Sequence, residues 1–319
     1  MTTLSAPNTE VRKAVIAVCT FRRVPLLRPL VHELMEQIAK LPEYWRARVV
    51  VIDNDPKGSA LQELSRIARD YDDKCFSYVH ESRAGVGYAR NLAFTLAGVA
   101  EWLIFFDDDQ LPDESWLSQL LSAGSSGRGE LYVGPVRPSL PKDCPAWARG
   151  GWAWARPEFS DGEYRSHAGF GNILISPVAL SDPSCKVKAA FIQGPGEDTS
   201  VTSELVAKGY RIVHVSGASA AEPVPVQRLN MPWVLARQRA AGKVWAQLQL
   251  SGRKPAARLC LSFLRLLVNA ASLGLRGLAL RSSRDCAKAR AKVAIARGYV
   301  DAVVSSFPLR RAKQSPETS

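Results

Sequence analysis

Short apolar runs alternate with amphipathic segments along the first two-thirds of the chain. The apolar runs are continuous, as in buried parallel strands, and predict strands at residues 14–19, 48–52, 76–80, 102–106 and 130–136. Between them, apolar residues recur at helical spacing over residues 26–40, 58–71, 87–98 and 116–121. This order of strands and helices predicts an α/β fold, with a mostly parallel sheet and helices on both of its faces.

Each of the first four predicted strands is followed by charged or hydrogen-bonding residues. These segments are residues 20–23 (TFRR), 53–55 (DND), 81–83 (ESR) and 107–109 (DDD). Ligands of open α/β sheets bind at the carboxyl ends of the strands. Because the four polar segments all occupy that position, the sequence predicts that they line one polar cleft.

The chain then changes character. Residues 137–170 are rich in Pro, Gly and Trp and predict a long excursion over the sheet. Strands at 171–176 and 211–215 and a helix at 199–208 are expected to complete the fold.

The Pro-rich residues 222–225 indicate a domain boundary. We therefore expect one α/β domain over residues 1–227, a basic helical region over residues 228–305, and a disordered tail over residues 306–319.

Composition and charge separate the same two regions. The chain has 319 residues, of which 46% are apolar and 23% charged, so it can bury a core without disulfide or metal staples. Residues 1–227 carry 24 Lys and Arg against 27 Asp and Glu, whereas residues 228–319 carry 18 against 3, a net charge of +15. Such asymmetry directs the C-terminal region toward a polyanion, either nucleic acid or an anionic membrane surface.

Cysteine spacing and the N-terminus point to the cytosol. The 6 cysteines are scattered with no CxxC pair, which excludes a structural zinc site of the usual spacing and fits reduced thiols. The first 13 residues lack the apolar core of a signal peptide, and nowhere do 18 uncharged apolar residues run together. We therefore expect neither export nor a membrane-spanning helix.

Three carboxylates, Asp107, Asp108 and Asp109, directly follow a buried strand. Neighbouring carboxylates repel one another unless a cation or donor compensates. Mg²⁺ or Mn²⁺ with a diphosphate as co-ligand suits such a group, because these ions prefer a few carboxylates and phosphate oxygens. The alternative is a solvated acidic turn before a helix. The buried strand and a second acidic cluster at 53–55 favour the cation site.

Two glycine-containing segments lead into predicted helices. In residues 83–91 (RAGVGYARN) the glycines let the backbone approach a ligand, and the helix start favours an anion. The spacing matches neither a dinucleotide fingerprint nor a P-loop, and a surface arginine on a plain helix-start loop is the alternative. Residues 194–198 (GPGED) place Glu197 and Asp198 where a carboxylate can cap the helix and can also act as a general base.

Taken in order, five segments resemble the family 2 glycosyltransferases. They are residues 19–23 (CTFRR), 51–55 (VIDND), 85–91 (GVGYARN), 106–109 (FDDD) and 196–198 (GED). The likeness spans about residues 14–240 and is greatest to the branch that builds bacterial exopolysaccharides such as succinoglycan. It implies the GT-A fold, a nucleoside-diphosphate sugar donor such as a UDP-sugar, a divalent cation, and inversion at the anomeric carbon. Residues 14–136 would then form the nucleotide-sugar half and residues 137–227 the acceptor half.

The resemblance also implies roles for matching positions on the donor side. Thr20, Phe21 and Arg22 would border the nucleobase, and Asp53 would bond to it. Donor contacts are further implied for four residues nearer the ribose and the diphosphate: Arg83, Arg90, Asp107 and Asp108.

Catalytic and metal positions follow from the same resemblance. Asp109 matches the metal-binding carboxylate, and Asp198 matches the catalytic base, with Glu197 as its neighbour. Asn172 resembles the segment that faces the donor sugar and the acceptor, and Trp152 is expected on that side.

One position departs from the family. Many relatives have a metal-binding His after the last strand, where this chain reads AEPVP at residues 221–225. Glu222 could ligate a hard cation through oxygen. His214 lies within an apolar strand and is expected to be structural.

The implied reaction is a single displacement. Asp198 would take the proton of the acceptor while a cation held by Asp109 stabilises the leaving diphosphate. A nucleotidyltransferase on a similar sheet is an alternative, but it would ordinarily carry a Gly-rich loop with a Lys after the first strand. A non-catalytic membrane-bound scaffold is another, and it would have no need of the acidic motifs.

The C-terminal region predicts basic amphipathic helices at residues 257–281 and 284–297. In the first, only 10 uncharged residues separate Arg265 from Arg276, too few to span a bilayer, so we expect a helix lying in the headgroup plane. Packing of its leucine face on the α/β domain is the alternative. Few aromatic residues interleave the basic ones, so nucleic acid is not the expected partner. A lipid-linked or saccharide acceptor would place the enzyme in the cytoplasm, on the inner face of a bacterial membrane.

Overall fold

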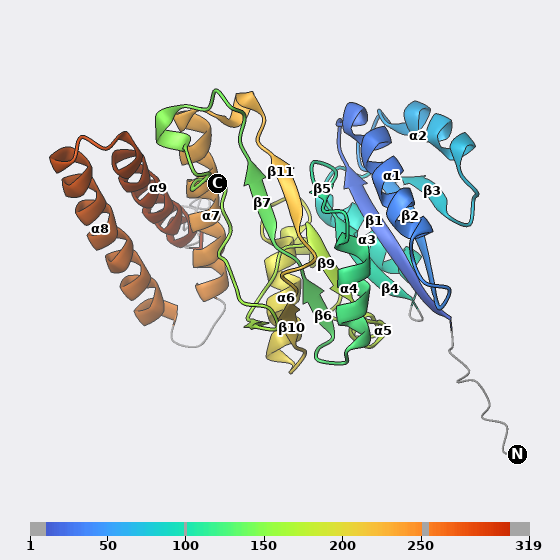
Figure 1. Cartoon of the computed structure of the whole chain (residues 1–319). Helices are drawn as coiled ribbons and strands as arrows, with labels where there is room; N and C mark the ends of the chain where they lie inside the picture. Colours follow the sequence, from blue (N-terminus) through green and yellow to red (C-terminus); the bar gives the residue numbers. More distant parts are fainter. Residues whose placement is uncertain (1–10, 99–100, 251–254, 307–319) are drawn as a thin grey trace, which may run out of the picture. The chain divides into compact units, whose positions relative to one another are not determined.

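The fold is built from two units, which are described separately (Figure 1). A computed structural model describes residues 11–98, 101–250 and 255–306 of the chain. The first unit comprises Met1–Leu140 and Trp154–Val224, and the second comprises Pro141–Ala153 and Pro225–Ser319.

Eight strands form the main sheet of the first unit in the order β3-β2-β1-β4-β9-β6-β10-β8. Neighbouring strands are parallel from β3 through β2 and β1 to β4, and β6 is parallel to β10. Strand β9 is antiparallel to both β4 and β6, and β8 is antiparallel to β10. The strands are β1 (Arg12–Thr20), β2 (Trp45–Asp53), β3 (Phe76–His80), β4 (Trp102–Phe106), β6 (Leu131–Val133), β8 (Tyr164–Arg165), β9 (Asn172–Ile175) and β10 (Ile212–His214). The mainly parallel α/β sheet is therefore confirmed.

A second, three-stranded sheet has the order β5-β11-β7. Its strands are β5 (Leu111–Pro112), β7 (Val136–Ser139) and β11 (Ala220–Pro223). The single strand predicted at residues 130–136 is wrong, because the chain breaks at Gly134 and Pro135 and passes from one sheet to the other. A side chain at Gly134 would collide with the Ala218 carbonyl, and Pro135 has no N–H for a ladder, so neither residue continues the strand.

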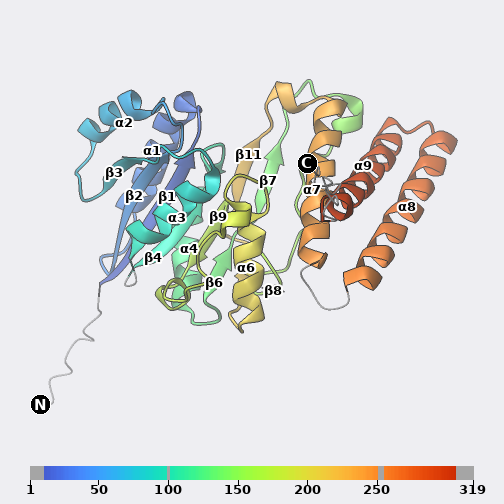
Figure 2. The same cartoon turned by 180° about the vertical axis from the view of Figure 1, so that it is seen from behind.

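Helices cover both faces of the main sheet. On one face Ile16 and Val18 of β1 pack with the apolar sides of α1, α2 and α4; on the other, Val15 and Ala17 pack with α3, α5 and α6. Figure 1 shows α1 and α4 on the near side, and Figure 2 shows α3 and α6 from behind. The helices are α1 (Val24–Ala39), α2 (Leu61–Ile67), α3 (Val86–Ala97), α4 (Trp116–Ser125), α5 (Pro177–Leu180) and α6 (Glu197–Ala207). Successive side chains of β1 therefore point to opposite faces of the sheet, and both faces are buried, as the continuous apolar run predicts.

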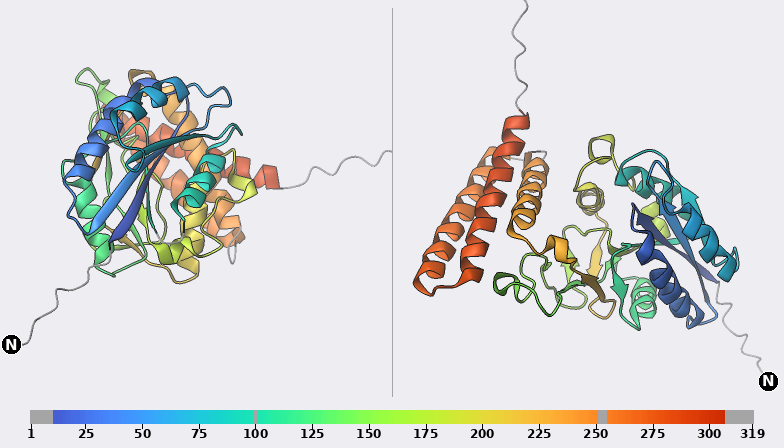
Figure 3. Two further views of the ribbon diagram at one scale, coloured as in Figure 1. Left: turned by 90° about the vertical axis from the view of Figure 1, so that its right-hand side faces the viewer. Right: turned by 90° about the horizontal axis from the view of Figure 1, so that it is seen from above.

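Three helices make up most of the second unit: α7 (Met231–Leu250), α8 (Pro255–Ala279) and α9 (Ser283–Ser306). Helix α9 packs along both α7 and α8 (Figure 3). Gly242 and Gly298 let the backbones of α7 and α9 approach closely, since a Cβ at either position would overlap a carbonyl of the other helix. Arg239 of α7 adds a two-bond ion pair to Asp301 of α9, at 2.6 and 2.7 Å.

The boundary between the units differs from the expected one. Residues 141–153 were assigned from sequence to the α/β domain, but they belong to the second unit, where their 3₁₀ turn at Ala146–Ala148 contacts α9. Gln238 of α7 also bonds to the carbonyl of Ala153. The return to the second unit comes after Val224, 3 residues before the predicted boundary. The predicted disordered tail, residues 306–319, lies outside the described residues apart from Ser306, which ends α9.

The apolar part of α8 is longer than the sequence pattern suggested. Among the described residues, Arg258–Ala279 is one helix of 22 residues that is long and apolar enough to cross a membrane by length and composition alone. The sequence criterion counted uncharged residues alone and therefore stopped at Arg265 and Arg276, whereas the helix continues through both. Only 11% of its most apolar window is buried within the protein.

Candidate functional site

The carboxyl ends of β1 and β4 are joined through the aspartate turn. Thr20, the last residue of β1, donates its hydroxyl to Oδ2 of Asp108 at 2.7 Å, and both side chains are buried. Arg23 bonds to Asp108 and lies 3.0 Å from Oδ2 of Asp109. One guanidinium therefore neutralises part of the charge of two neighbouring carboxylates, which allows them to stay together at the strand end.

Asp53 at the end of β2 bonds to the backbone of the turn that follows the strand. The side chain is fully buried, and its two oxygens accept the backbone N–H groups of Asp55 and Ala60 at 3.0 and 2.8 Å. The carboxylate thus holds the turn after β2, as in an Asx turn. Asp53 therefore positions the loop, and its contact with a nucleobase stays a prediction.

The same turn positions Phe21 and Arg22. Arg22 adopts a φ of +57°, which is rare for a residue other than glycine, and makes two bonds of 3.3 Å to Asp55. Its guanidinium lies 4.7 Å from the centre of the Phe21 ring, which is 47% exposed. An exposed aromatic ring beside a guanidinium is suited to stacking with a planar base.

Arg83 is held at the end of β3. Its guanidinium makes two bonds to Glu81, at 2.9 and 2.7 Å, and lies 4.4 Å from the centre of the Tyr88 ring. The Arg83 side chain is 65% exposed, so these contacts orient it without enclosing it.

Arg90 of α3 connects the aspartate turn to the start of α6. Its Nη1 donates to Oε1 of Glu197 at 2.6 Å, and its Nη2 lies 3.7 Å from Oδ1 of Asp107. The guanidinium also lies 5.0 Å from the centre of the Phe170 ring. Two acidic segments separated by about 90 residues of sequence therefore meet around one buried guanidinium, that of Arg90.

Asp198 lies beside this cluster with its two oxygens in different settings. Oδ1 accepts the backbone N–H and the hydroxyl of Thr199, which anchors the carboxylate at the helix start. Oδ2 lies on the side of Gly169, where a Cβ atom would be 3.2 Å away. Asp107 approaches the same loop, because a Cβ at Gly171 would lie 2.5 Å from its Oδ2. The glycines leave both carboxylates room.

Burial and mutual repulsion perturb the acidic groups. Burial raises the pKa of Asp107; Arg90 opposes this shift, and the charges of Asp109 and Asp198 add to it. Burial likewise raises the pKa of Asp108 and of Glu197, against Arg23 and Arg90 respectively. Because the carboxylates are buried and repel one another, the cluster favours binding of further positive charge.

Cys19 was part of the segment singled out by sequence, and it lies within the field of these charges. Burial is the main cause that raises the pKa of its thiol to about 12; Arg90 opposes the shift, and the charges of Asp107, Asp108 and Glu197 contribute to it. The thiol is therefore a neutral packing group at neutral pH.

Asn172 does not face a substrate, contrary to the sequence expectation. It is 2% exposed, its Oδ1 accepts the indole N–H of Trp116 at 2.8 Å, and its Nδ2 donates to the carbonyls of Ala218 and Pro135. All of its polar atoms join α4 and the two sheets, so its role is structural. Trp152, also expected on the acceptor side, lies in the second unit, where its indole N–H bonds to the carbonyl of Trp147 at 2.6 Å.

We predict that Asn172→Ala lowers the free energy of unfolding by about 3 kcal/mol, because the buried partners lose their hydrogen bonds. Urea denaturation measures the change, with the exposed Gln62→Ala as control. Unchanged stability combined with a raised KM for the acceptor would contradict the structural role.

Glu222, considered from sequence as a metal ligand, is paired with an arginine. Nη2 of Arg156 lies 3.0 Å from Oε2 of Glu222, which is 9% exposed. Within residues 11–98, 101–250 and 255–306, no group of three or more His, Cys, Asp or Glu side chains forms a ready metal site. A cation at the aspartate turn would therefore draw part of its coordination from a bound ligand.

The residues around the turn nevertheless fit a hard cation. Gln110 is 1% exposed; its amide donates to Asp107, and its Oε1 accepts no hydrogen bond from any part of the chain that the structure describes. Carboxylate oxygens, a buried amide oxygen without a donor and uncompensated negative charge are the setting that Mg²⁺ or Mn²⁺ prefers.

Sequence reasoning missed three residues at this site. Arg23 was noted only as part of a polar segment, and Gln110 and Arg156 were not singled out. The signal for Gln110 was its position directly after the triple aspartate. Arg156 gave no local signal, since its partner Glu222 is 66 residues away.

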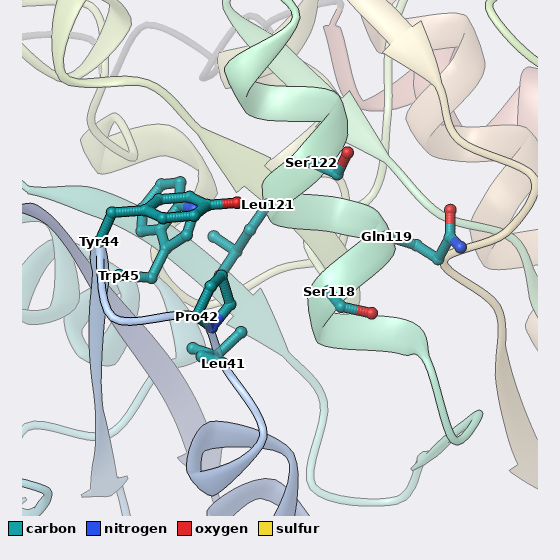
Figure 4. Close-up of a pocket in the computed structure, with 8 residues that line it drawn as sticks. All are labelled: Leu41, Pro42, Tyr44, Trp45, Ser118, Gln119, Leu121 and Ser122. Atoms are coloured by element: carbon teal, nitrogen blue, oxygen red, sulfur yellow. The ribbon is translucent and has the colours of Figure 1, made fainter. Parts of the chain in front are cut away.

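A pocket of about 310 Å³ lies elsewhere in the first unit (Figure 4). It is formed by the connection before β2 and by one side of α4, and none of the 8 lining residues is charged. Trp45 begins β2, so the pocket is at the amino end of that strand, opposite the end that carries the acidic cluster. It has no carboxylate, histidine or cysteine for metal binding.

Comparison with known proteins agrees with this geometry. The model of the family described as Glycosyl transferase family 2 matches residues 15–163. The chain is 30% identical over 239 residues, 73% of its length and 74% of the other's, to the succinoglycan biosynthesis protein ExoM of Rhizobium meliloti (strain 1021).

Two solved structures share the fold. The mannosyltransferase PcManGT of Pyrobaculum calidifontis, determined with GDP-Man and Mn²⁺, superposes with a TM-score of 0.60 and 17% identity over 95% of this chain and 90% of its own. The S. aureus TarS 1–349 structure with UDP gives a TM-score of 0.51 and 13% identity over 93% of each chain.

These findings define a glycosyltransferase with the GT-A fold. The chain belongs to glycosyl transferase family 2. The alternatives left open from sequence, a nucleotidyltransferase and a non-catalytic scaffold, are thereby set aside.

Proposed function

We propose that the enzyme transfers a sugar from a nucleoside-diphosphate sugar, a UDP-sugar in the first instance, to a lipid-linked or saccharide acceptor during synthesis of a cell-surface polysaccharide or glycolipid. The observation that carries the proposal is the convergence of the aspartate turn and the start of α6 on Arg90. The R. meliloti relative, whose name refers to succinoglycan biosynthesis, supports the pathway class. Release of nucleotide from a panel of UDP- and GDP-sugars, with and without Mn²⁺, tests the proposal.

Glu197 and Asp198 have different roles in the proposed inverting displacement. Glu197 is 6% exposed and bonded to Arg90, so it is suited to positioning. Asp198 has one anchored oxygen and one beside Gly169, so it is suited to receive the proton of an acceptor hydroxyl. A single base and no carboxylate nucleophile give inversion at the anomeric carbon.

On the donor side, we propose that Phe21 and Arg22 border the base, with Thr20 and Asp108 supporting the strand end and Asp107 near the ribose. Arg83 and Arg90 contribute positive charge toward the diphosphate. We propose that Asp109 would hold a divalent cation, which would supply positive charge to the leaving diphosphate when bound. PcManGT, whose structure contains Mn²⁺, supports this choice of ion.

Mn²⁺ together with UDP or GDP is expected to raise the Tm of the protein by about 2–4 °C at saturating concentration, because both bind the folded state. Asp109→Asn should lose the Mn²⁺-dependent part of the rise and keep the nucleotide-dependent part. Differential scanning fluorimetry measures both, with the exposed Asp73→Asn as control. An undiminished Mn²⁺ effect in the Asp109 variant would place the ion elsewhere.

We further propose that the second unit holds the enzyme on the cytoplasmic face of an anionic membrane. Helix α8 packs on its unit through Leu259, Phe263 and Leu266, and it exposes a different apolar side. The exposed side chains on that side include Leu261, Leu264, Val268, Leu275 and Leu278. The region's charge of +15 complements acidic headgroups.

A further inference from the structure

Arg156 is held by its ion pair at the edge of the acidic cluster. The Nη2 atom lies 3.0 Å from Oε2 of Glu222, and the arginine side chain remains 42% exposed while the carboxylate side chain is 12% exposed. A buried carboxylate that orients an accessible guanidinium resembles the way binding sites present arginine to an anion.

The small sheet places this pair next to the aspartate turn. Strand β11 is antiparallel to β5, with Ala221 opposite Leu111 and Ala220 opposite Pro112. The same register continued by one residue sets Glu222 opposite Gln110, the residue that follows Asp109. The chain thus brings Arg156 to the turn through Glu222, although neither residue is close to the turn in sequence.

Two other arginines at the turn, Arg90 and Arg23, each contact two carboxylates of the protein. Arg90 is 10% exposed and lies between Glu197 and Asp107, and Arg23 pairs with both Asp108 and Asp109. Arg156 is more exposed than either of these two arginines. Its charge also reaches the turn: burial raises the pKa of Asp107, and Arg156 is among the groups that lower it.

We propose that Arg156 binds the diphosphate of the sugar donor and that Glu222 is the positioning residue that orients it. The inference rests on the proposed function, because it requires a nucleoside-diphosphate donor. It gives Glu222 a role other than that of a metal ligand. In the reaction, the Arg156 guanidinium would donate hydrogen bonds to phosphate oxygens whose charge grows as the glycosidic bond breaks.

The test compares nucleotides that differ only in phosphate number. Affinities of UDP, UMP, GDP and GMP are measured by isothermal titration calorimetry for the full-length protein and for Arg156→Gln. We expect the variant to bind the preferred diphosphate about tenfold more weakly, because a charge-assisted hydrogen bond is lost, and to bind the matching monophosphate unchanged. Arg211→Gln is the matched control, since Arg211 is 49% exposed and paired with Glu130 in the same unit.

Two further variants guard against misfolding and separate the roles. Arg156→Lys keeps the charge but not the forked geometry, and it should lose less affinity for the diphosphate than Arg156→Gln. Glu222→Gln should weaken the diphosphate and spare the monophosphate, as expected of a residue that acts through Arg156. Equal losses for mono- and diphosphate, or unchanged diphosphate affinity in both Arg156 variants, would overturn the inference. If the wild-type protein binds neither UDP nor GDP, the proposed function itself fails, and the inference fails with it.

Discussion

Asp198→Asn is expected to reduce turnover by about 10²–10⁴-fold while the enzyme still binds its sugar nucleotide. The amide retains an oxygen that can accept the N–H and hydroxyl bonds of Thr199, so the start of α6 should keep its geometry. What the amide cannot do is take a proton from the acceptor. On one preparation of Asp198→Asn, a coupled assay measures nucleotide release and calorimetry measures donor affinity. Loss of release with unchanged affinity would identify Asp198 as the base.

The neighbouring residue and a remote aspartate serve as controls. Asp70→Asn removes a carboxylate that is 50% exposed and paired with Arg28, and it should not affect turnover. Glu197→Gln should instead weaken the link to Arg90, and its loss of activity should come with reduced stability. Normal turnover in Asp198→Asn would rule out Asp198 as the base, and the assignment would then pass to a group outside the α6 start.

The strands and their polar ends were predictable because their physical cause is local. A run such as WLIFF at β4 is apolar on both faces, which requires a strand covered on both sides, and the aspartates that follow can only lie at its carboxyl end. The same reasoning placed residues 20–23 and 107–109 in one polar cleft, and the bond between Thr20 and Asp108 agrees with it. Helices α1, α2, α3, α4, α6 and α8 were found to within four residues at their ends, whereas α5 and α7 were not predicted as helices and α9 continues nine residues beyond its predicted end.

The individual roles of polar residues were less predictable, because remote partners decide them. Asn172 is structural only because Trp116 and Ala218 surround it, and they lie 56 and 46 residues away. Glu222 became an arginine partner for the same reason. Asp53 is the exception: its Asx-turn bond to the second following N–H is a local pattern, and it could have been read from the sequence.

The arginines of α8 support the proposed helix in the membrane plane over a helix that spans the membrane. Arg258, Arg265 and Arg276 are spaced by 7 and 11 residues, so they form one stripe along the helix beside the exposed leucines. A spanning orientation would put Arg265 within the hydrocarbon, at a cost of about 2.5–3.5 kcal/mol even on insertion scales. An in-plane orientation places the whole stripe among the headgroups and the leucines beneath them. The length of the apolar stretch alone would have favoured spanning; the position of the charges favours the interface.

Replacing Leu264 and Leu275 together by Gln is therefore expected to reduce binding to vesicles of phosphatidylglycerol and phosphatidylethanolamine by about tenfold or more, because each leucine loses its transfer into the acyl region. The two side chains are 58% and 71% exposed, so the fold should tolerate the change. Arg258→Gln, Arg265→Gln and Arg276→Gln combined should weaken binding about 100-fold at low salt, at about 1 kcal/mol per charge, and reduce its salt dependence. Val178→Gln, at a position 63% exposed in the first unit, is the control in vesicle co-sedimentation.

Two results would contradict this account. Binding that does not depend on salt and survives both sets of changes would show that α8 is not the membrane contact. Resistance of the wild-type protein to alkaline carbonate extraction would show that the helix spans the bilayer instead of lying along it.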